Sequence, residues 1–381
     1  MKIRKIAHKL HCWLGMLSGI IVFIICLTGA IWALKINGWI DSDPEYSVAK
    51  IQQPKKQPSE LAKITSDRLG WQPTYITYYR NNSVRIGAYG KGIRSSAVVN
   101  SFTGEILWEN SGSDPGEFDF WHFIRRGHRS LWLPFHIGRP IVNYSTLVFV
   151  LVLISGMVRW FPKTKKALRK RVRFNWKSRT PLKRRLVDMH GIFGFYMFFF
   201  LLVISFTGMV WGIEWWSKGL YGMTTGGKTL PAWGAGRSDT TAMNSMDTYT
   251  AVDILFKRIA EENPEAESIG INFPDTKDAA SVVNVTVNPV AGVYYNSDRY
   301  TFDRYSLKEL GIQDVYNGKY AGLKWGDKLR RMNYDIHIGA VAGVPGRIIV
   351  FLAALFGASL PCTGLYIFII KRKKRKGRAE F

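Results

Sequence analysis

The chain has 381 residues, and its 53 Lys and Arg against 28 Asp and Glu give a formal net charge of +25. Nearly all of this excess lies in three short segments beside apolar stretches, so it indicates membrane topology rather than nucleic-acid binding. Three cysteines without a CxxC pair argue against a disulfide-stapled or metal-cluster protein, and without a GxGxxG or P-loop motif nucleotide binding is not expected.

The first element is residues 1–34, a basic N-terminus followed by the apolar run HCWLGMLSGIIVFIICLTGAIW. About 20 apolar residues cross a bilayer, and this run is longer than the roughly 7–15 apolar residues of a signal peptide. We therefore predict a retained membrane span. Three further uncharged stretches of spanning length predict a membrane α-helical fold with four transmembrane helices; they are residues 140–158, 189–213 and 348–370.

Two long segments, residues 35–139 and 214–345, connect the spans on one side of the membrane. The first contains VVNSFTGEIL and other runs of β-branched and aromatic residues between turn signals. The second contains the helical pattern TAVDILFKRIAEE followed by the strand-like SVVNVTVNP. We expect two small exported α+β domains, supported by each other or by the membrane surface.

The basic segments predict the orientation. Residues 1–10, 159–187 and 371–381 carry 24 Lys and Arg and one acidic residue, so the positive-inside rule places them in the cytoplasm. We expect a multi-pass protein of the bacterial inner membrane with both termini cytoplasmic. The predicted order is the N-terminus and first span at 1–34, a periplasmic domain at 35–139, the second span at 140–160, a basic cytoplasmic loop at 161–187, the third span at 188–213, a second periplasmic domain at 214–345, the fourth span at 346–370 and a basic tail at 371–381.

The spans share a repeated frame. After His11 in the first span and His190 in the third, Gly follows by four residues, Thr-Gly by 17 and 18, and Trp by 21. In the second and fourth spans, Ser-Gly or Thr-Gly begins 17 residues after the Gly of a Gly-Arg pair, at Gly138 and Gly346. We infer two parallel two-span repeats, related by a pseudo-twofold axis along the membrane normal.

The seven histidines divide by topology. Three lie at the cytoplasmic ends of the first and third spans, and four lie near the outer ends of the second and fourth: His8, His11 and His190, then His122, His128, His136 and His337. A single His at a membrane boundary could be an interfacial polar residue. Because these histidines recur across a repeat, we interpret them as candidate ligands.

Paired imidazoles favour haem over zinc. Zinc usually takes three or four protein ligands, often including Cys or carboxylate, and no acidic residue lies near His11. Two neutral imidazoles from neighbouring helices suit the axial positions of a haem. Gly15 and Gly194, one turn after each His, would leave room for a flat macrocycle, although Gly15 also forms a GxxxG packing pair with Gly19.

Two haems near opposite faces would form an electron path, because the helix from His11 to Trp32 rises about 32 Å. Electrons would enter from a quinol or a cytoplasmic donor and leave on the outer side. We interpret Trp32, Trp160 and Trp211 as residues of the interfacial aromatic belt. The predicted ligands are His11 with His190 on the cytoplasmic side and His128 with His337 on the outer side; the alternates are His8 and His136.

Four span motifs carry a family resemblance: HKLHCWLG…LTGAIW, GHRSLWLPFHIGRPIV…LISGMVRW, DMHGIFG…SFTGMVWG and DIHIGAVAGVPGRIIVF…PCTGLYIF. Together they resemble the PepSY-associated transmembrane family over nearly the whole chain, and VVNSFTGEIL resembles the strand–turn signature of PepSY domains. The layout is most similar to the haem-containing inner-membrane ferric-siderophore reductases of that family, the ferrioxamine type. Two departures are Asn100, where the PepSY turn often has Asp, and DRYSLKEL, which keeps the second turn only loosely.

The resemblance implies b-type haems on the four predicted ligands and reduction of a periplasmic Fe(III)–siderophore. Because Fe(II) is softer and less charged, one electron is enough to release iron from a hard-oxygen chelate for uptake. The chelate would dock near the outer histidines; side chains that could line this dock, or simply lie at the interface, are Arg125, Arg126, Arg129, Trp121, Trp132 and Trp325.

Two other functions stay open at this point. A histidine-dependent permease for metal or siderophore would need charged residues near mid-span, where the sequence has only Ser, Thr, Asn and Cys. A membrane-anchored PepSY protein that binds a peptidase or another partner, without redox activity, leaves the histidine pattern unexplained.

Overall fold

The computed structural model describes residues 2–40, 46–90, 93–110, 118–234, 236–242, 247–312 and 314–376. It divides into two compact units: unit 1 is residues 1–42, 119–220 and 333–381, and unit 2 is residues 43–118 and 221–332. Each unit therefore contains segments from both halves of the chain. Residues 377–381 of the expected basic tail lie outside the described residues.

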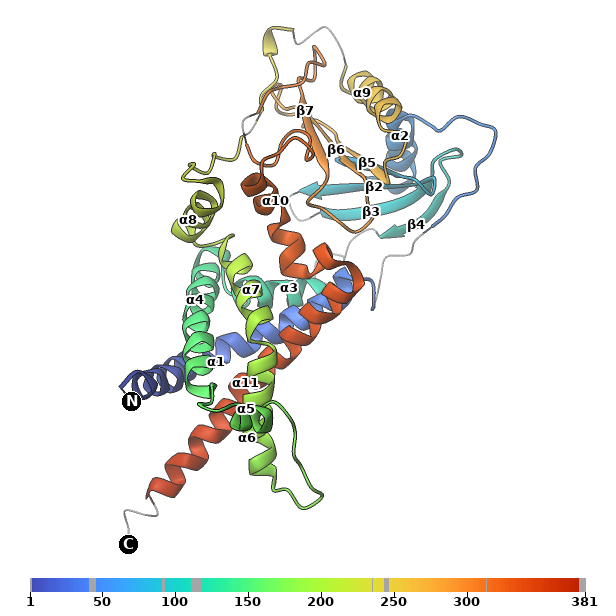
Figure 1. Ribbon diagram of the computed structural model, residues 1–381. Coiled ribbons are helices and arrows are strands. Elements are labelled where there is room, and N and C mark those ends of the chain that lie inside the picture. The colour runs from blue at the N-terminus through green and yellow to red at the C-terminus, as the bar shows by residue number, and fades with distance from the viewer. Residues whose placement is uncertain are drawn as a thin grey trace. The chain divides into compact units, whose positions relative to one another are not determined.

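Unit 1 is built on long apolar helices (Figure 1). Three of them are long and apolar enough to cross a membrane: α1 (Lys2–Ile36), α4 (Phe135–Trp160) and the apolar part of α11 (Gly343–Lys376). Helix α1 packs against both α4 and α11. These helices correspond to the expected first, second and fourth spans.

The third apolar segment is a bent pair of helices rather than one straight span. Helices α6 (Leu182–Tyr196) and α7 (Phe198–Met209) meet at 60° and satisfy the spanning criteria only together. Gly191 and Gly194 lie in α6 just before the joint, and glycine weakens a helix by about 1 kcal/mol relative to Ala and is common at kinks. Within the described residues there are thus three spanning helices, or four if the bent pair is one span.

Short helices flank the spans. Helix α3 (Phe120–Ser130) precedes α4 and buries Ile124, Gly127 and Ser130, spaced by three, as it packs against α1 and α4. Helix α10 (Trp325–Ile338) precedes η2 (Ala340–Ala342) and α11. Because α3 and the end of α10 pack with the spans, the expected domain limits of 139 and 345 lie beyond the ends of unit 2. The remaining short helices of this part are α5 (Lys165–Arg171) and α8 (Glu214–Thr225).

The basic segments meet at one end of unit 1. The start of α1, the end of α4, α5, α6 and the end of α11 lie towards the lower end in Figure 1. Two hydrogen bonds connect them: the Arg4 guanidinium donates to the Phe161 carbonyl at 2.9 Å, and the Tyr196 hydroxyl donates to the Val172 carbonyl at 3.0 Å. A common basic end is the arrangement that the positive-inside rule requires of an even number of spans.

Unit 2 contains one seven-stranded antiparallel sheet with the strand order β4-β3-β2-β1-β5-β6-β7. The first of the two long connecting segments supplies β1 (Tyr75–Tyr79), β2 (Ser83–Gly90), β3 (Ile93–Asn100) and β4 (Ile106–Asn110). The second supplies β5 (Ser268–Asn272), β6 (Val283–Asn288) and β7 (Asp298–Phe302). The two segments, which we expected to form two small domains supported by each other or by the membrane surface, thus share one sheet. Pairing β1 with β5 removes two exposed strand edges, whose unpaired backbone groups would invite aggregation.

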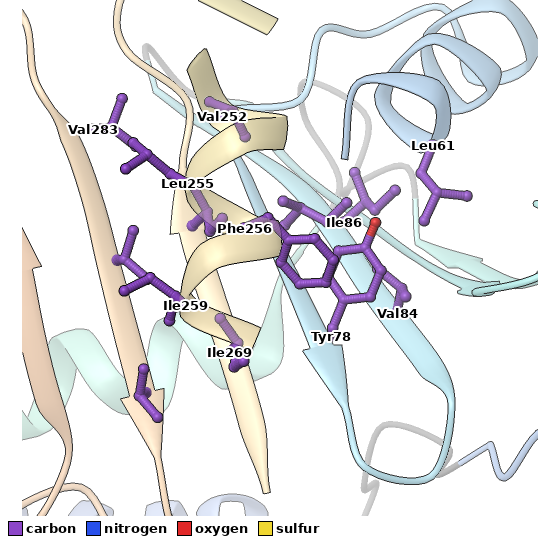
Figure 2. Packing of buried hydrophobic residues seen from close by; sticks show 14 of the residues in the cluster. Leu61, Tyr78, Val84, Ile86, Val252, Leu255, Phe256, Ile259, Ile269 and Val283 are labelled. Carbon is purple, nitrogen blue, oxygen red and sulfur yellow. The ribbon is translucent and has the colours of Figure 1, made fainter. Parts of the chain in front are cut away.

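The core of unit 2 also joins the two segments. Helices α2 (Pro58–Leu69) and α9 (Thr248–Glu262) contribute side chains to one cluster with alternate residues of the strands. Figure 2 shows Leu61 of α2 and Phe256 of α9 facing the strands, with the Phe256 ring stacked on Tyr78 at 4.1 Å. Ser59 donates its backbone N–H to the Asp253 carboxylate at 2.9 Å, which ties α2 to α9. The short helix η1 (Thr240–Ala242) precedes α9.

The two turns that depart from the PepSY signature have similar conformations in this chain. After β3, the Asn100 side-chain oxygen accepts from the backbone N–H of Phe102 and Thr103 at 2.9 and 3.2 Å. After β7, the Asp303 carboxylate accepts from the backbone N–H of Tyr305 and Ser306 at 3.0 and 2.7 Å. The left-handed residue four positions after each is Gly104 in the first turn and Leu307 in the second. Both amide and carboxylate oxygens can therefore close this turn.

Candidate functional site

Four of the seven histidines form two pairs in unit 1. His11 of α1 and His190 of α6 have ring centroids 6.0 Å apart with planes at 75°. His128 of α3 and His337 of α10 have ring centroids 6.3 Å apart with planes at 55°. All four residues are half-buried. Each pair takes one member from each half of the chain, and these are the pairs that the repeated frame predicts.

In the two histidines of the first half, Nδ1 is engaged by a backbone carbonyl of a neighbouring span. His11 Nδ1 lies 3.0 Å from the Val152 oxygen in α4, and His128 Nδ1 lies 2.9 Å from the Ile25 oxygen in α1. A carbonyl can only accept, so Nδ1 carries the proton and Nε2 is the nitrogen with a free lone pair. Such a bond orients a ligating imidazole and raises its basicity.

In the second half, hydroxyl groups take part as well. His190 Nδ1 lies 2.9 Å from Thr363 Oγ1 in α11. His337 Nδ1 lies 3.1 Å from the Ile204 carbonyl oxygen and 2.9 Å from Thr207 Oγ1, both in α7. Nδ1 of both histidines is therefore engaged by oxygen atoms of neighbouring helices.

Each imidazole also packs on a glycine of a neighbouring helix. A Cβ added at these glycines would lie only 2.9–3.3 Å from the Cε1 atom of the ring: Gly156 faces His11, Gly29 faces His128, Gly208 faces His337 and Gly364 faces His190. Each of these glycines follows the Ser or Thr of the repeated frame. The Ser/Thr-Gly steps are therefore the contact sites of the histidine rings. The sequence interpretation did not identify this role, although the spacing of 17 and 18 residues was its signal.

The Gly-Arg pairs explain how His128 and His337 are placed. A Cβ at Gly138 would lie 1.9 Å from the Ser130 carbonyl oxygen, and a Cβ at Gly346 would lie 2.2 Å from that of Gly339. Ser130 and Gly339 are each two residues after a ligand candidate. Each Gly-Arg step thus packs against the end of the segment that carries the outer His. The intervening loop absorbs the difference between ten residues after His128 and nine after His337.

Two further contacts attach these segments to the spans. A Cβ at Gly127 of α3 would lie 3.1 Å from Thr28 Cγ2 of α1, so α3 approaches α1 closely one residue before His128. Asn333 Nδ2 of α10 donates to the Thr207 carbonyl of α7 at 3.2 Å, one turn before His337. Both outer histidines therefore reach their glycines from helices that are fixed on a span.

The alternates occupy different surroundings. His136 is exposed at the start of α4, whereas the ring of His128 faces His337. His8 lies one turn before His11, with Nδ1 3.5 Å from Cys12 Sγ. Gly15 and Gly194 are less crowded than the glycines beneath the rings: an added Cβ would meet one atom at 3.8 Å, from Val152 or Leu360. That is ordinary van der Waals contact.

Five of the six side chains expected at a dock lie on or beside α3. The Trp132 indole folds back on α3, where it donates to the Phe123 carbonyl at 2.8 Å and covers Gly127. Arg126 donates to the Trp132 carbonyl at 3.0 Å. These contacts give Trp132 and Arg126 a role in closing the turn after α3. The others are Trp121 against Trp32 at 6.4 Å, Arg125 over Trp32 at 5.9 Å, Arg129 over Phe135 at 5.4 Å, and Trp325, which is exposed in unit 2.

Trp211 contacts a ligand candidate directly. Its ring lies 5.1 Å from the His337 ring at 83°, and 6.1 Å from the Tyr334 ring. The sequence interpretation treated this residue only as part of an interfacial belt. Its position 21 residues after His190 brings it to the opposite histidine pair.

The donor set of each pair fits a metal that brings its own equatorial ligands. Among the described residues, no three His, Cys, Asp or Glu side chains gather closely enough to hold a metal ion, so a site made of protein ligands alone is not supported there. Two imidazoles that hold one metal ion between them through bonds of about 2.0–2.1 Å have ring centres roughly 6 Å apart. The observed 6.0 and 6.3 Å agree with axial ligation of haem iron.

The spanning helices and the two histidine pairs between them define an integral membrane protein with two potential axial-ligand sites. The chain belongs to the PepSY-associated TM region family, whose model matches residues 8–371. The comparison with curated proteins gives no match. The expected family and the membrane class are thus confirmed, whereas the cofactor and the reaction stay proposals.

Proposed function

We propose that this protein is a reductase of the bacterial inner membrane that binds two haems b and passes electrons outward to a ferric siderophore. The observation that carries this proposal is the recurrence of one histidine geometry at two places, with 6.0 and 6.3 Å between ring centroids. A single such pair could arise from packing. Two pairs, each assembled from both halves of a duplicated chain, favour a common ligand.

The histidines and the glycines beside them would have different roles in holding the haems. His11 with His190, and His128 with His337, would hold one haem each through Nε2, because their Nδ1 atoms are engaged by carbonyl or hydroxyl oxygens. Bound haem would supply reversible one-electron transfer at each site. The glycines beneath the rings let the helices approach closely enough for opposite imidazoles to face each other.

The two sites lie far enough apart to connect the two faces of a membrane. His128 packs on Gly29, which follows His11 by 18 residues in α1, so the sites are separated by about 27 Å along that helix. Between them lies an apolar cluster that includes Val22, Phe149 and Leu201. This cluster would exclude water from the space between the two sites.

The outer end supplies cationic and aromatic groups for a chelate. The Arg125 guanidinium lies over the Trp32 ring, 5.9 Å from its centroid. Reduction there would weaken a hard-oxygen chelate, since Fe(II) is a softer ion than Fe(III). The buried polar residues of the described spans are uncharged, namely Ser18, Thr28, Asn143, Ser155, Ser205, Thr207 and Thr363, which does not favour a permease that relays protons or binds metal at mid-span.

The test is the haem content of the purified protein, expressed with ample haem supply. We expect two b-type haems per chain by the pyridine haemochrome assay, both reducible by dithionite. His190→Ala should remove the cytoplasmic haem and retain the outer one, and His337→Ala should do the reverse. His136→Ala, which changes an exposed histidine of α4, is the matched control and should retain both.

A colourless, well-folded preparation would refute the proposal. The substrate is tested separately by offering ferric hydroxamate, catecholate and citrate complexes to the dithionite-reduced protein while trapping Fe(II). Reoxidation of the haem no faster than in buffer, with every complex, would show that ferric-siderophore reduction is the wrong reaction even if the haems are present.

A further inference from the structure

Arg139 is half-buried near the outer histidine pair, and few groups compensate its positive charge. Its guanidinium donates to the Trp211 carbonyl at 3.3 Å and lies 5.5 Å from the Phe135 ring centroid. Arg129 lies 5.4 Å from the same ring. Among the described residues, neither arginine forms an ion pair, so two like charges share one aromatic ring without a counter-ion.

The fold brings both arginines beside the outer histidines. Arg129 directly follows His128 in α3. Arg139 follows Gly138, whose missing Cβ allows α4 to approach the Ser130 carbonyl at the end of α3. The carbonyl that accepts from Arg139 belongs to Trp211, whose ring contacts His337 at 5.1 Å. Arg139 is therefore tied to the neighbours of both members of the pair.

The local electrostatics favour an anion at this place. A guanidinium has five N–H donors, and one hydrogen bond to a neutral carbonyl leaves most of them for another partner. Arg139 is the fifth residue of α4, and the first turn of this helix contains no acidic residue to offset the positive end of its dipole. Planar, bidentate recognition of carboxylates is the ordinary use of such an arginine.

We propose that Arg129 and Arg139 bind the propionate carboxylates of the haem held by His128 and His337. This inference rests on the proposed function, since it requires a haem at the outer pair. It assigns Arg129 a different role from the substrate dock that the sequence suggested. A carboxylate could also come from an arriving ferric chelate, and the experiment separates these two sources.

The experiment uses full-length protein carrying His190→Ala, so that only the outer haem is present. The rate of haem loss to an excess of a haem-scavenging apoprotein is measured without any ferric chelate. Arg139→Gln should raise this rate about tenfold or more, because hydrogen bonds to charged groups contribute more than neutral ones. Arg139→Lys should raise it less, because it keeps the charge but loses the bidentate geometry. Arg68→Gln, which removes an exposed guanidinium from the last turn of α2 in unit 2, should leave it unchanged.

The decisive comparison replaces haem by its dimethyl ester, which has no carboxylates. In the protein that carries only His190→Ala, the ester should be lost about tenfold faster than haem. In the protein that also carries Arg139→Gln, ester and haem should be lost at similar rates. An equal effect of Arg139→Gln on haem and ester would overturn the propionate assignment, since the arginine would then act on folding or on the iron. If the variant alters only the Kd of a ferric chelate, the carboxylate source is the substrate and the assignment is also wrong. Absence of haem from the wild-type protein would instead refute the proposed function.

Discussion

At the scale of single residues, the glycines beneath the histidine rings offer a test that separates the two pairs. An added Cβ at Gly156 would lie 2.9 Å from His11 Cε1, and one at Gly29 would lie 3.0 Å from His128 Cε1. Both distances are shorter than ordinary carbon contacts of about 3.5–4.0 Å, so the ring must move. We expect Gly156→Ala to weaken haem binding at the cytoplasmic pair and Gly29→Ala to weaken it at the outer pair, each by about tenfold.

Haem loss rates and pyridine haemochrome spectra of the two variants provide the measurement. Gly219→Ala in α8 is the control, because an added Cβ there meets no atom within 4 Å. If Gly156→Ala and Gly29→Ala affected both haems equally, the glycines would serve general helix packing and not the individual rings.

The pairing of the histidines can be predicted from the sequence, whereas their contacts with the spanning helices cannot. The common frame brings His11 together with His190, and the Gly-Arg register brings His128 together with His337. Gly29 was visible as part of the same frame, but its partner His128 is about 100 residues away and lies on another helix. Only the packing of α3 against α1 brings them together. Sequence spacing reports residues that share a helix face, and it says nothing about which helix faces it.

At the scale of elements, the pairing of β1 with β5 is the contact that makes one unit of two segments. Ile76 of β1 lies opposite Ile271 of β5, and both side chains are fully buried in the shared core. Truncation of such a residue costs about 2–5 kcal/mol of stability because it leaves a cavity. We expect Ile271→Ala to raise hydrogen–deuterium exchange in β1 and β2 as well as in β5 and β6.

The control for this measurement is Val290→Ala, which changes an exposed side chain of the same unit. Faster exchange confined to β5, β6 and β7 would show that the two segments unfold independently, as two separate domains would. The strands themselves were predictable, because their β-branched and aromatic residues alternate with polar ones. Their order was not, since β1 and β5 are about 190 residues apart and each carries an edge that could pair elsewhere.

The bend between α6 and α7 is likewise not predictable from the sequence. The run from Met189 to Ile213 has the length and composition of a straight span, and it contains no proline that would predict a break. The sequence pattern predicts space for a cofactor at Gly194, yet Gly194 and Gly191 also weaken the helix next to the joint. The consequence of a glycine depends on whether packing straightens or bends the helix around it.

At the scale of the whole molecule, the proposed function requires unit 2 and the basic loop to lie on opposite sides of the membrane. Residues 159–187 contain no acidic residue, and the potential at the cytoplasmic face retains such segments. One exposed position on each side can be tested by cysteine labelling: Ser178 in the basic loop and Thr276 in unit 2. The three native cysteines, Cys12, Cys26 and Cys362, can be replaced by Ala to give a silent background.

In that background we expect a membrane-impermeant maleimide to label Thr276→Cys in intact spheroplasts, and to label Ser178→Cys only after the membrane is opened. The two variants are each other's control, because both positions are exposed and differ only in the side they occupy. Labelling of both, or of neither, in intact spheroplasts would place unit 2 and the basic loop on the same side. An electron delivered from the cytoplasm to the outer histidine pair would then have no membrane to cross, and outward reduction of a chelate would have to be abandoned even for a haem-containing protein.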